Sequence, residues 1–184
     1  GQHVLMETLS KSDFYGDWVE SRAAKGYDSG AQFVVAGEVL YRLNFGGLNE
    51  EYGPNVLASG GSAENLANIL REHYPRHRVS RVDSCEDYHH KDVYDYLRKK
   101  ALKIAREQKV KVREIVKPLE ESDDGRTLYI GSTSSPVSMR LYEKGKQLDC
   151  GDEWVRAELQ FRPSKQLKDI AAHLSPLETW AVAK

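Results

Sequence analysis

The chain has 184 residues, of which 40% are hydrophobic and 30% are charged, and its formal net charge is −1. This composition is typical of a globular protein with a charged exterior, and the length favours one domain with one core. A net charge near zero argues against a uniformly basic nucleic-acid binder. No apolar run approaches the roughly 20 residues that a membrane-spanning helix needs, so we expect no membrane partner.

The start of the chain and its cysteines bear on where the protein works. Residues 1–14, GQHVLMETLSKSDF, lack a basic start followed by an apolar block, so no secretory signal is visible. The initial glycine in place of methionine suggests a trimmed sequence. Cys85 and Cys150 lie far apart and form no metal-type pair. A reducing, cytoplasmic setting is therefore expected.

The first part of the chain predicts strands followed by a helix. Residues 32–45, QFVVAGEVLYRLNF, contain β-branched and aromatic residues interrupted by glycine, and residues 50–55, EEYGPN, supply a turn. Apolar residues then recur at helical spacing from Ala63 to Tyr74, with Ser62 as the expected N-cap. Pro75 should end this helix.

The remainder predicts a short strand, a long helix, four strands and two closing helices. The strand lies in residues 77–84 and the helix runs from about Tyr88 to Gln108. The later strands are expected over residues 109–116, 127–132, 137–145 and 153–163, and the last helices after Ser164 and Ser175. This order predicts an α+β fold with a largely antiparallel central sheet flanked by helices, in which one polar sheet face stays open for an active site.

Residues 98–117 form a basic segment, with nine basic residues against two acidic ones, and residues 119–125, LEESDDG, follow with four acids. The segment predicts a basic helix face for DNA, and the alternative is a solvated helix beside a charged loop. Nearby tyrosines could stack on unpaired bases or belong to the core: Tyr88, Tyr94 and Tyr96. The candidate DNA contacts are Arg98, Lys99, Lys103, Arg106, Lys109 and Lys111.

Alternation along the late strands places polar side chains on one face of the sheet. In one strand every second residue from Val137 is apolar, and in another every second residue from Val155 is apolar. The residues that alternate with these apolar ones point to the opposite face. The strand near residue 82 joins the polar side if Val82 faces the core. The resulting set is Asp83, Arg140, Tyr142, Lys144, Arg156 and Glu158.

Each residue type in this set has a chemical use. Two carboxylates can hold Mg²⁺ or Mn²⁺ and leave room for a phosphate oxygen. A tyrosine phenol, with a free pKa near 10, needs nearby cations or a metal before it becomes a nucleophile. Arginine and lysine can hold a phosphodiester and stabilise the charge of its transition state. The set suits attack by tyrosine on a DNA phosphate, while the alternative is an ordinary solvent-facing sheet with cross-strand charge pairs.

Residues 129–147, YIGSTSSPVSMRLYEKGKQ, followed by WVRAELQFRP at residues 154–163, resemble a known signature. The signature is that of the replication initiation factor family, the Rep_trans-type rolling-circle initiators and relaxases of plasmids, filamentous phages and conjugative elements. It consists of a strand ending in Gly-Ser, a strand ending in Arg-x-Tyr-Asp/Glu-Lys, and a strand carrying Arg-x-Glu. LASGGSAENL at residues 57–66 and RVSRVDSCED at residues 78–87 are similar to upstream parts of the family. The resemblance spans roughly Val56 to Pro163.

The resemblance implies a DNA nickase and strand transferase. Such an enzyme binds a replication or transfer origin in a single-stranded or hairpin region and joins a tyrosine to the 5′-phosphate. It frees a 3′-hydroxyl that primes synthesis, and it needs a divalent metal, Mg²⁺ or Mn²⁺. The resemblance further implies a host helicase as partner, with a homodimer as another option. The whole chain, residues 1–184, is expected to be a single nicking domain without a second domain.

Carried over by motif, the nucleophile corresponds to Tyr142 and the metal carboxylates to Asp83 and Glu158. Glu143 is a further ligand candidate, although regular alternation places it on the apolar side unless the strand end or a bulge turns it. The residues that would contact phosphate are Arg140, Lys144 and Arg156.

Several alternatives stay open at this stage. Tyr129 is the rival nucleophile, with packing as its other role. The chain lacks the His-hydrophobic-His strand of many rolling-circle nickases, and His89 and His90 are adjacent, as surface residues often are. The second functional hypothesis is a non-catalytic DNA-binding module on the same scaffold.

Overall fold

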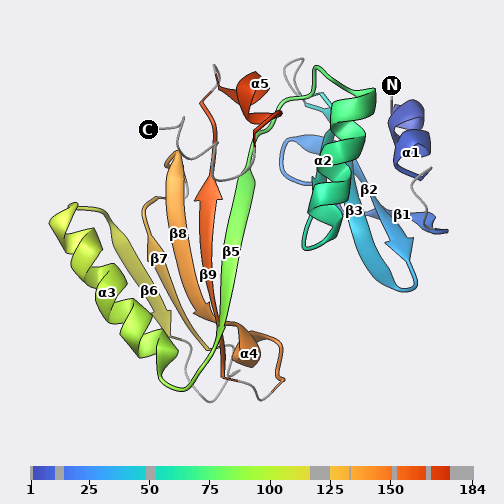
Figure 1. The fold of residues 1–184 in the computed structure, drawn as a ribbon. Helices are drawn as coiled ribbons and strands as arrows, with labels where there is room; N and C mark the ends of the chain where they lie inside the picture. Colours follow the sequence, from blue (N-terminus) through green and yellow to red (C-terminus); the bar gives the residue numbers. More distant parts are fainter. Residues whose placement is uncertain are drawn as a thin grey trace. The chain divides into compact units, whose positions relative to one another are not determined.

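The computed structural model describes residues 2–10, 15–48, 53–116, 125–132, 134–150, 153–164 and 167–174 (Figure 1). The chain divides into two compact units, Gly1–His77 and Arg78–Lys184. Each unit has its own hydrophobic cluster, so the expectation of one core is wrong. The two units are distinguished by their internal packing, which does not establish whether each folds by itself. The single nicking domain over residues 1–184 therefore stays a prediction.

The first unit is a four-stranded antiparallel sheet with two helices, and its strand order is β1-β2-β3-β4. Its cluster joins side chains of α1, α2, β2 and β3, among them Leu9, Phe33 and Leu66. The strands predicted over residues 32–45 are confirmed as parts of β2 and β3. Its elements are α1 (Gln2–Ser10), β1 (Asp17–Ser21), β2 (Tyr27–Val35), β3 (Glu38–Gly47), β4 (Asn55–Ala58) and α2 (Ser62–His73).

Two local features of this unit follow from backbone conformation. Ala36 and Gly37 join β2 to β3 with φ of 49° and 85°, and two positive φ values in a two-residue turn match the right-handed twist of a hairpin. The predicted N-cap of α2 is wrong by one position, since Gly61 is the cap and Ser62 is already helical. Pro75 does follow the end of the helix, as predicted.

The second unit is a five-stranded antiparallel sheet with strand order β5-β9-β8-β7-β6. The predicted α+β class with antiparallel strand pairing and flanking helices is confirmed, but the strands form two sheets where one central sheet was expected. The helix predicted after Ser175 lies outside the described residues. The elements are β5 (Val82–His89), α3 (Val93–Glu107), β6 (Val112–Val116), β7 (Arg126–Ile130), β8 (Val137–Glu143), α4 (Lys144–Gln147), β9 (Trp154–Phe161) and α5 (Lys168–Ala171).

Strand β5 is longer than its sequence pattern predicts. The strand was expected to stop near residue 84 and the helix to start near Tyr88, but β5 continues to His89 and α3 begins at Val93. All eight residues of β5 face partners on β9, from Val82 opposite Phe161 to His89 opposite Trp154. This pairing gives hydrogen-bond partners to the backbone groups of β5 up to His89. A helix that started at Tyr88 would have left the facing residues of β9 without those partners.

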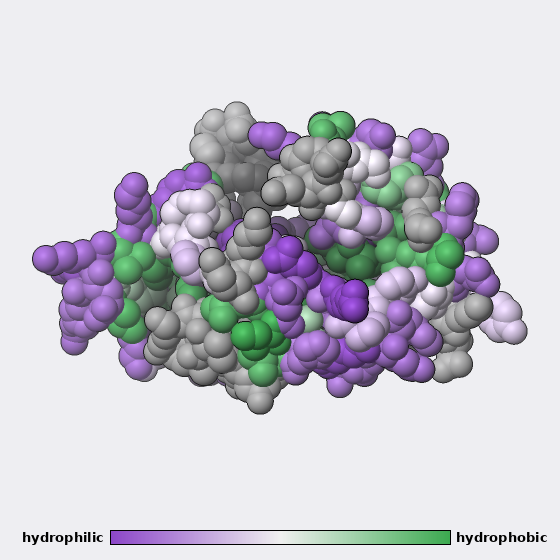
Figure 2. All heavy atoms as spheres, turned by 90° about the horizontal axis from the view of Figure 1, so that it is seen from above, coloured by the Kyte–Doolittle hydropathy of each residue, from purple (hydrophilic) through white to green (hydrophobic). Residues whose placement is uncertain are grey.

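Helix α3 covers one face of the five-stranded sheet (Figure 1). Leu128, Leu141 and Val155 lie under it, and Tyr94 and Ala101 of α3 complete this cluster. The alternation predicted for β8 and β9 is therefore confirmed, because their apolar residues share the helix-covered face. Within the described part of the chain, no helix is long and apolar enough to cross a membrane. Hydrophilic residues predominate on the surface seen in Figure 2.

The other sheet face, here called the polar face, takes every second residue of the five strands. Cross-strand register places these residues in rows, since directly opposed residues of antiparallel strands point to the same side. The polar face comprises Asp83, Cys85, Asp87 and His89 of β5, Trp154, Arg156, Glu158 and Gln160 of β9, Ser138, Arg140 and Tyr142 of β8, Thr127 and Tyr129 of β7, and Arg113 and Ile115 of β6.

Candidate active site

Tyr142 lies on the polar face of β8, the middle strand of the sheet, one residue before that strand ends. It is directly opposite Arg156 of β9, which is itself opposite Asp87 of β5, so these three residues form one row. Arg140 and Glu158 form the next row. Directly opposed residues have Cβ atoms about 5 Å apart, so neighbouring members of each row are close enough for their side chains to touch.

The Tyr142 ring is packed between basic groups. Its residue is 5% exposed, the Arg140 guanidinium carbon lies 4.5 Å from the ring centroid, and Lys144 Nζ lies 5.8 Å from it. Burial and the negative charge of Glu158 raise the pKa of the Tyr142 phenol, while Arg140 and Arg156 oppose the rise. The hydroxyl is therefore protonated near neutral pH and is not a preformed phenolate.

Glu158 is 9% exposed and is held by Arg140. Arg140 Nη2 donates to both carboxylate oxygens of Glu158, over 3.0 and 2.8 Å. A charge this buried needs such a partner, because an unpaired carboxylate would carry a large desolvation penalty. The pair also places the guanidinium of Arg140 beside the phenol of Tyr142.

Asp83 has a similar partner in Arg81, just before β5. Arg81 Nε donates to both Asp83 oxygens, over 2.8 and 3.0 Å, and Arg81 Nη2 contacts Oδ2 as well. Gln160 Nε2 of β9 lies 3.4 Å from the same Oδ2 atom. Because Asp83 is opposite Gln160, it sits diagonally from Glu158 on the same face.

The predicted metal ligands are only partly brought together. Asp83 and Glu158 share the polar face, each already bound to an arginine. Among the described residues, no three His, Cys, Asp or Glu side chains gather closely enough to hold a metal. Two carboxylates still fit Mg²⁺, which binds proteins through one or two carboxylates and takes its other oxygens from phosphate and water.

Glu143 lies apart from these two carboxylates, on the other side of the sheet. Arg126 of β7 donates to it from the backbone over 2.7 Å and from Nη2 over 3.0 Å. Arg126 Nη1 also donates to Asp95 of α3 over 2.9 Å. Although burial opposes the effect, Arg126 holds the pKa of Glu143 below its ordinary value. Regular alternation continues to the end of β8, and Glu143 therefore ties the sheet to α3.

Asp87 is a polar-face residue that the sequence pattern missed. Arg156 donates to both its oxygens, each over 2.7 Å. Chiefly through these hydrogen bonds, Arg156 lowers the pKa of Asp87 to about 2. Alternation from Asp83 would have reached Asp87 if the strand had been extended past residue 84. Arg81 was missed for a different reason, since it precedes the strand and no periodicity marks it.

The rival tyrosine also lies on the polar face. Tyr129 of β7 is directly opposite Arg140, and the guanidinium carbon of Arg113 lies 4.7 Å from its ring centroid. Tyr142 is opposite Thr127, so the two tyrosines occupy neighbouring rows on neighbouring strands. Tyr129 is therefore a matched control for Tyr142.

The family assignment rests on the same stretch of chain. The model of the replication initiation factor family matches residues 79–178, which is more than half of the 184 residues. The chain belongs to this family. The match contains all five strands of the sheet that carries the polar face. The predicted membership is thus confirmed, and DNA is the partner that a replication initiator implies.

The fold of this replication initiation factor also resembles a solved structure. The rolling circle replication initiator protein from Geobacillus stearothermophilus matches with a TM-score of 0.60 and 22% sequence identity. The match covers 94% of this chain and 68% of that one. At this identity the likeness establishes the fold. No curated protein sequence matches the chain.

The basic segment runs from within α3 to residues beyond its end, so Lys109 and Lys111 lie outside the helix. Arg98 donates to both oxygens of Glu114 in β6, each over 2.6 Å, so it fastens the helix to the sheet. Lys103 lies 4.0 Å from Glu107 on an exposed part of the helix. The other predicted contacts are exposed, and their DNA role stays a prediction: Lys99, Arg106, Lys109 and Lys111.

The tyrosines near this helix do not form a stacking platform together. Tyr94 is 2% exposed and belongs to the core, and Tyr88 of β5 points away from the polar face. Tyr96 is 56% exposed, with Lys100 Nζ 4.4 Å from its ring centroid. Of the three, Tyr96 is the exposed one and Tyr88 is half-buried.

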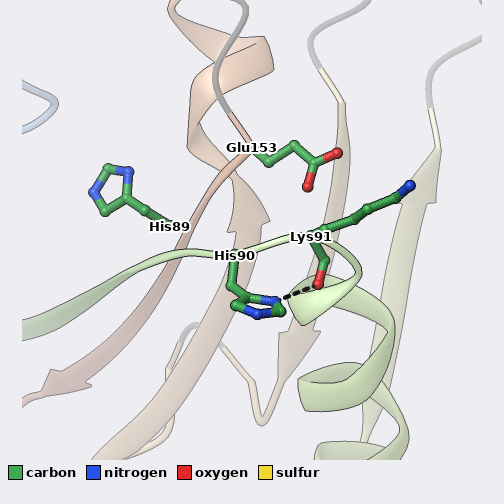
Figure 3. Close-up of a pocket in the computed structure, with 4 residues that line it drawn as sticks. All are labelled: His89, His90, Lys91 and Glu153. Atoms are coloured by element: carbon green, nitrogen blue, oxygen red, sulfur yellow. Dashed lines mark hydrogen bonds between the residues drawn. The ribbon is translucent and has the colours of Figure 1, made fainter.

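The adjacent histidines lie at the end of β5. His89 and His90 line a cavity of about 340 Å³ together with Lys91 and Glu153. In Figure 3 the His89 ring points away from Lys91 and Glu153, and His90 Nδ1 lies 2.8 Å from the Lys91 carbonyl oxygen. His89 belongs to the polar face and stacks on Trp154, with ring centroids 5.3 Å apart.

Proposed function

We propose that this replication initiation factor nicks one DNA strand at a replication or transfer origin by attack of Tyr142 on a phosphodiester. The observation that supports this best is the position of the Tyr142 phenol, which lies among three cations on the face that also carries Asp83 and Glu158. The cations are Arg140, Lys144 and Arg156.

In the proposed step, Tyr142 Oη forms a bond to phosphorus and the bond from phosphorus to the 3′-oxygen breaks. The phenol loses its proton, and the leaving 3′-oxygen gains one to become a hydroxyl. The products are a 5′-phosphotyrosine link and a free 3′ end. The guanidinium groups of Arg140 and Arg156 would hold the phosphate and stabilise the negative charge that builds on its oxygens.

The phenol needs help to react, because burial and Glu158 raise its pKa. A divalent cation held by Asp83 and Glu158 would offset the Glu158 charge and polarise the phosphate. Arg140, which binds Glu158, also lies beside the Tyr142 ring, where it would contact the phosphate oxygens. The cations around the phenol, Arg140, Lys144 and Arg156, would favour loss of its proton and so make it a nucleophile.

The test is incubation with supercoiled DNA carrying the element's own origin, with and without Mn²⁺, followed by a denaturing gel. The expected result is a metal-dependent shifted band that Tyr142→Phe abolishes, while DNA binding is largely kept because only a hydroxyl is lost. Tyr129→Phe is the matched control and should keep the band. If Tyr142→Phe still forms the adduct, the assignment of the nucleophile is wrong.

The second proposed function is a DNA-binding module without catalysis. The ion pairs of Asp83 and Glu158 favour it, because arginines already occupy the carboxylates that a metal would need. It predicts salt-sensitive binding of origin DNA with no metal-dependent cleavage. A host helicase partner, a homodimer and a cytoplasmic setting belong to both proposals and stay predictions.

A further inference from the structure

An aromatic pair stands beside the proposed nucleophile on the polar face. Trp154 of β9 and His89 of β5 are directly opposite each other, and their ring planes differ by 30°. Trp154 is half-buried, so its ring is held in place, and His89 is exposed, so its ring is accessible to a ligand. Two stacked flat rings at the end of a sheet present a π-surface of the kind that nucleobases bind.

Arg156 connects this pair to Tyr142. Its guanidinium carbon lies 5.5 Å from the Trp154 ring centroid, and its strand position is directly opposite Tyr142. Asp87 holds the guanidinium in a bidentate pair, which fixes its plane. Trp154 is two residues along β9 from Arg156, so its backbone lies on the order of 8 Å from that of Tyr142. One nucleotide can span that separation.

The surroundings of the pair suit a polyanion with bases. Arg156 and Lys144 supply positive charge on the Tyr142 side, and Lys91 lines the cavity next to His89. Glu153 is the acidic group on that cavity. A nucleobase is flat and uncharged, and the phosphates on either side of it carry the negative charge. Stacking in the middle and cations on both sides therefore match a single strand better than a duplex, whose bases are already stacked.

We infer that Trp154 and His89 form a stacking subsite for an unpaired DNA base adjacent to the phosphate that Tyr142 attacks. The inference rests on the proposed function for the location of that phosphate, while base stacking itself can be measured without cleavage. Under this inference Trp154 and His89 bind the substrate directly, beside the reacting atoms.

The test compares two single-stranded oligonucleotides of about a dozen nucleotides, a length within the range of single-strand sites. One is a thymidine homopolymer and the other has the same phosphates with abasic sugars. Binding is measured at low salt in a Tyr142→Phe background, so that no strand is cut. Trp154→Ala should weaken binding of the thymidine strand roughly 5- to 100-fold, and should leave the abasic strand nearly unchanged.

Two further variants guard against a folding defect. His89→Ala removes an exposed ring and should weaken the thymidine strand in the same direction, and Trp154→Phe should keep most of the affinity because it keeps a flat ring. Tyr15→Ala, which removes an exposed aromatic residue outside the five-stranded sheet, is the matched control and should have no effect. Equal losses on both oligonucleotides, or no loss in either Trp154→Ala or His89→Ala, would overturn the subsite.

The outcome is separable from that of the nicking proposal. An adduct at Tyr142 with no base-dependent loss in the Trp154 variants would reject the subsite and keep the nickase. A base-dependent loss with no adduct would keep the stacking site and reject the nickase. Failure of both measurements would reject both.

Discussion

The two faces of the five-stranded sheet use the same ion-pair chemistry for different ends. On the helix-covered face, Arg126 binds Glu143 of β8 and Asp95 of α3, so one guanidinium joins two strands and a helix. On the polar face, Arg140 binds Glu158 and the pair joins only neighbouring strands. The distances are alike, at 3.0 and 2.8 Å for the closest ion pairs to the two glutamates.

The two ion pairs differ in the tyrosine that lies beside each arginine. The Arg126 guanidinium carbon is 4.2 Å from the ring centroid of Tyr94, a core residue that α3 buries in the sheet. The Arg140 guanidinium is beside Tyr142, whose ring shares its face with Arg156 and Glu158. We therefore expect loss of a residue on the helix-covered face to cost stability, and loss of a residue on the polar face to cost chemistry.

The largest expected effect separates two residues that are adjacent in the chain. Leu141 is 0% exposed in the cluster under α3, and Leu141→Ala should lower the free energy of unfolding by about 2–5 kcal/mol, because it leaves a cavity. Tyr142→Phe should lower it by about 1 kcal/mol or less, since only a hydroxyl is lost. Urea unfolding measures both, and equal losses would contradict the division of the two faces.

The next effect compares the two glutamates. Glu143→Gln should lower the free energy of unfolding by about 1–3 kcal/mol, because it weakens charge-assisted hydrogen bonds from Arg126. Glu158→Gln should instead slow adduct formation roughly 100-fold or more, because it removes a proposed metal carboxylate. Unfolding curves and single-turnover adduct assays are run on both variants. The comparison fails if Glu143→Gln, once folded, slows the adduct as much as Glu158→Gln.

Much of this division was predictable from alternation alone. The sequence of β8 and β9 places Leu141 and Val155 on one face and Tyr142 and Glu158 on the other, and the register confirms it. A sheet strand has a strict period of two, so a correct start fixes every later side chain. The motif resemblance then directed attention to Tyr142, and the family match confirmed the family.

The features that alternation did not predict come from interactions between distant parts of the chain. Strand β5 is longer than its sequence pattern predicted, because all of its residues pair with β9, which lies some 70 positions later in the chain. Arg98 reads as a surface cation until β6 brings Glu114 to it. For Tyr94 the sequence left base stacking and core packing open, and contact with the sheet places it in the core. Local sequence gives the period of a strand or helix, but the partner that pairs with it is set by tertiary contacts.

The smallest expected effect concerns Asp87, the polar-face carboxylate with the clearest titration. Its folded pKa of about 2 lies below the ordinary 3.8, so its pair with Arg156 adds stability above about pH 4 that is lost as pH falls toward 2. The Asp87 side chain is 31% exposed, so solvent screening limits the gain to about 1 kcal/mol or less.

Asp87→Asn should therefore reduce the free energy of unfolding at pH ~5 and approach the wild-type value near pH ~2. Arg156→Gln is the matched variant, because it removes the other partner of the ion pair. It should reduce the change in the free energy of unfolding over the same pH range. Urea unfolding at the two pH values gives the difference for each chain. Because the pair joins β5 to β9 without touching the cluster under α3, the loss should stay well below that of Leu141→Ala. A pH dependence unchanged in both variants would show that the pair orients Arg156 for phosphate without stabilising the sheet.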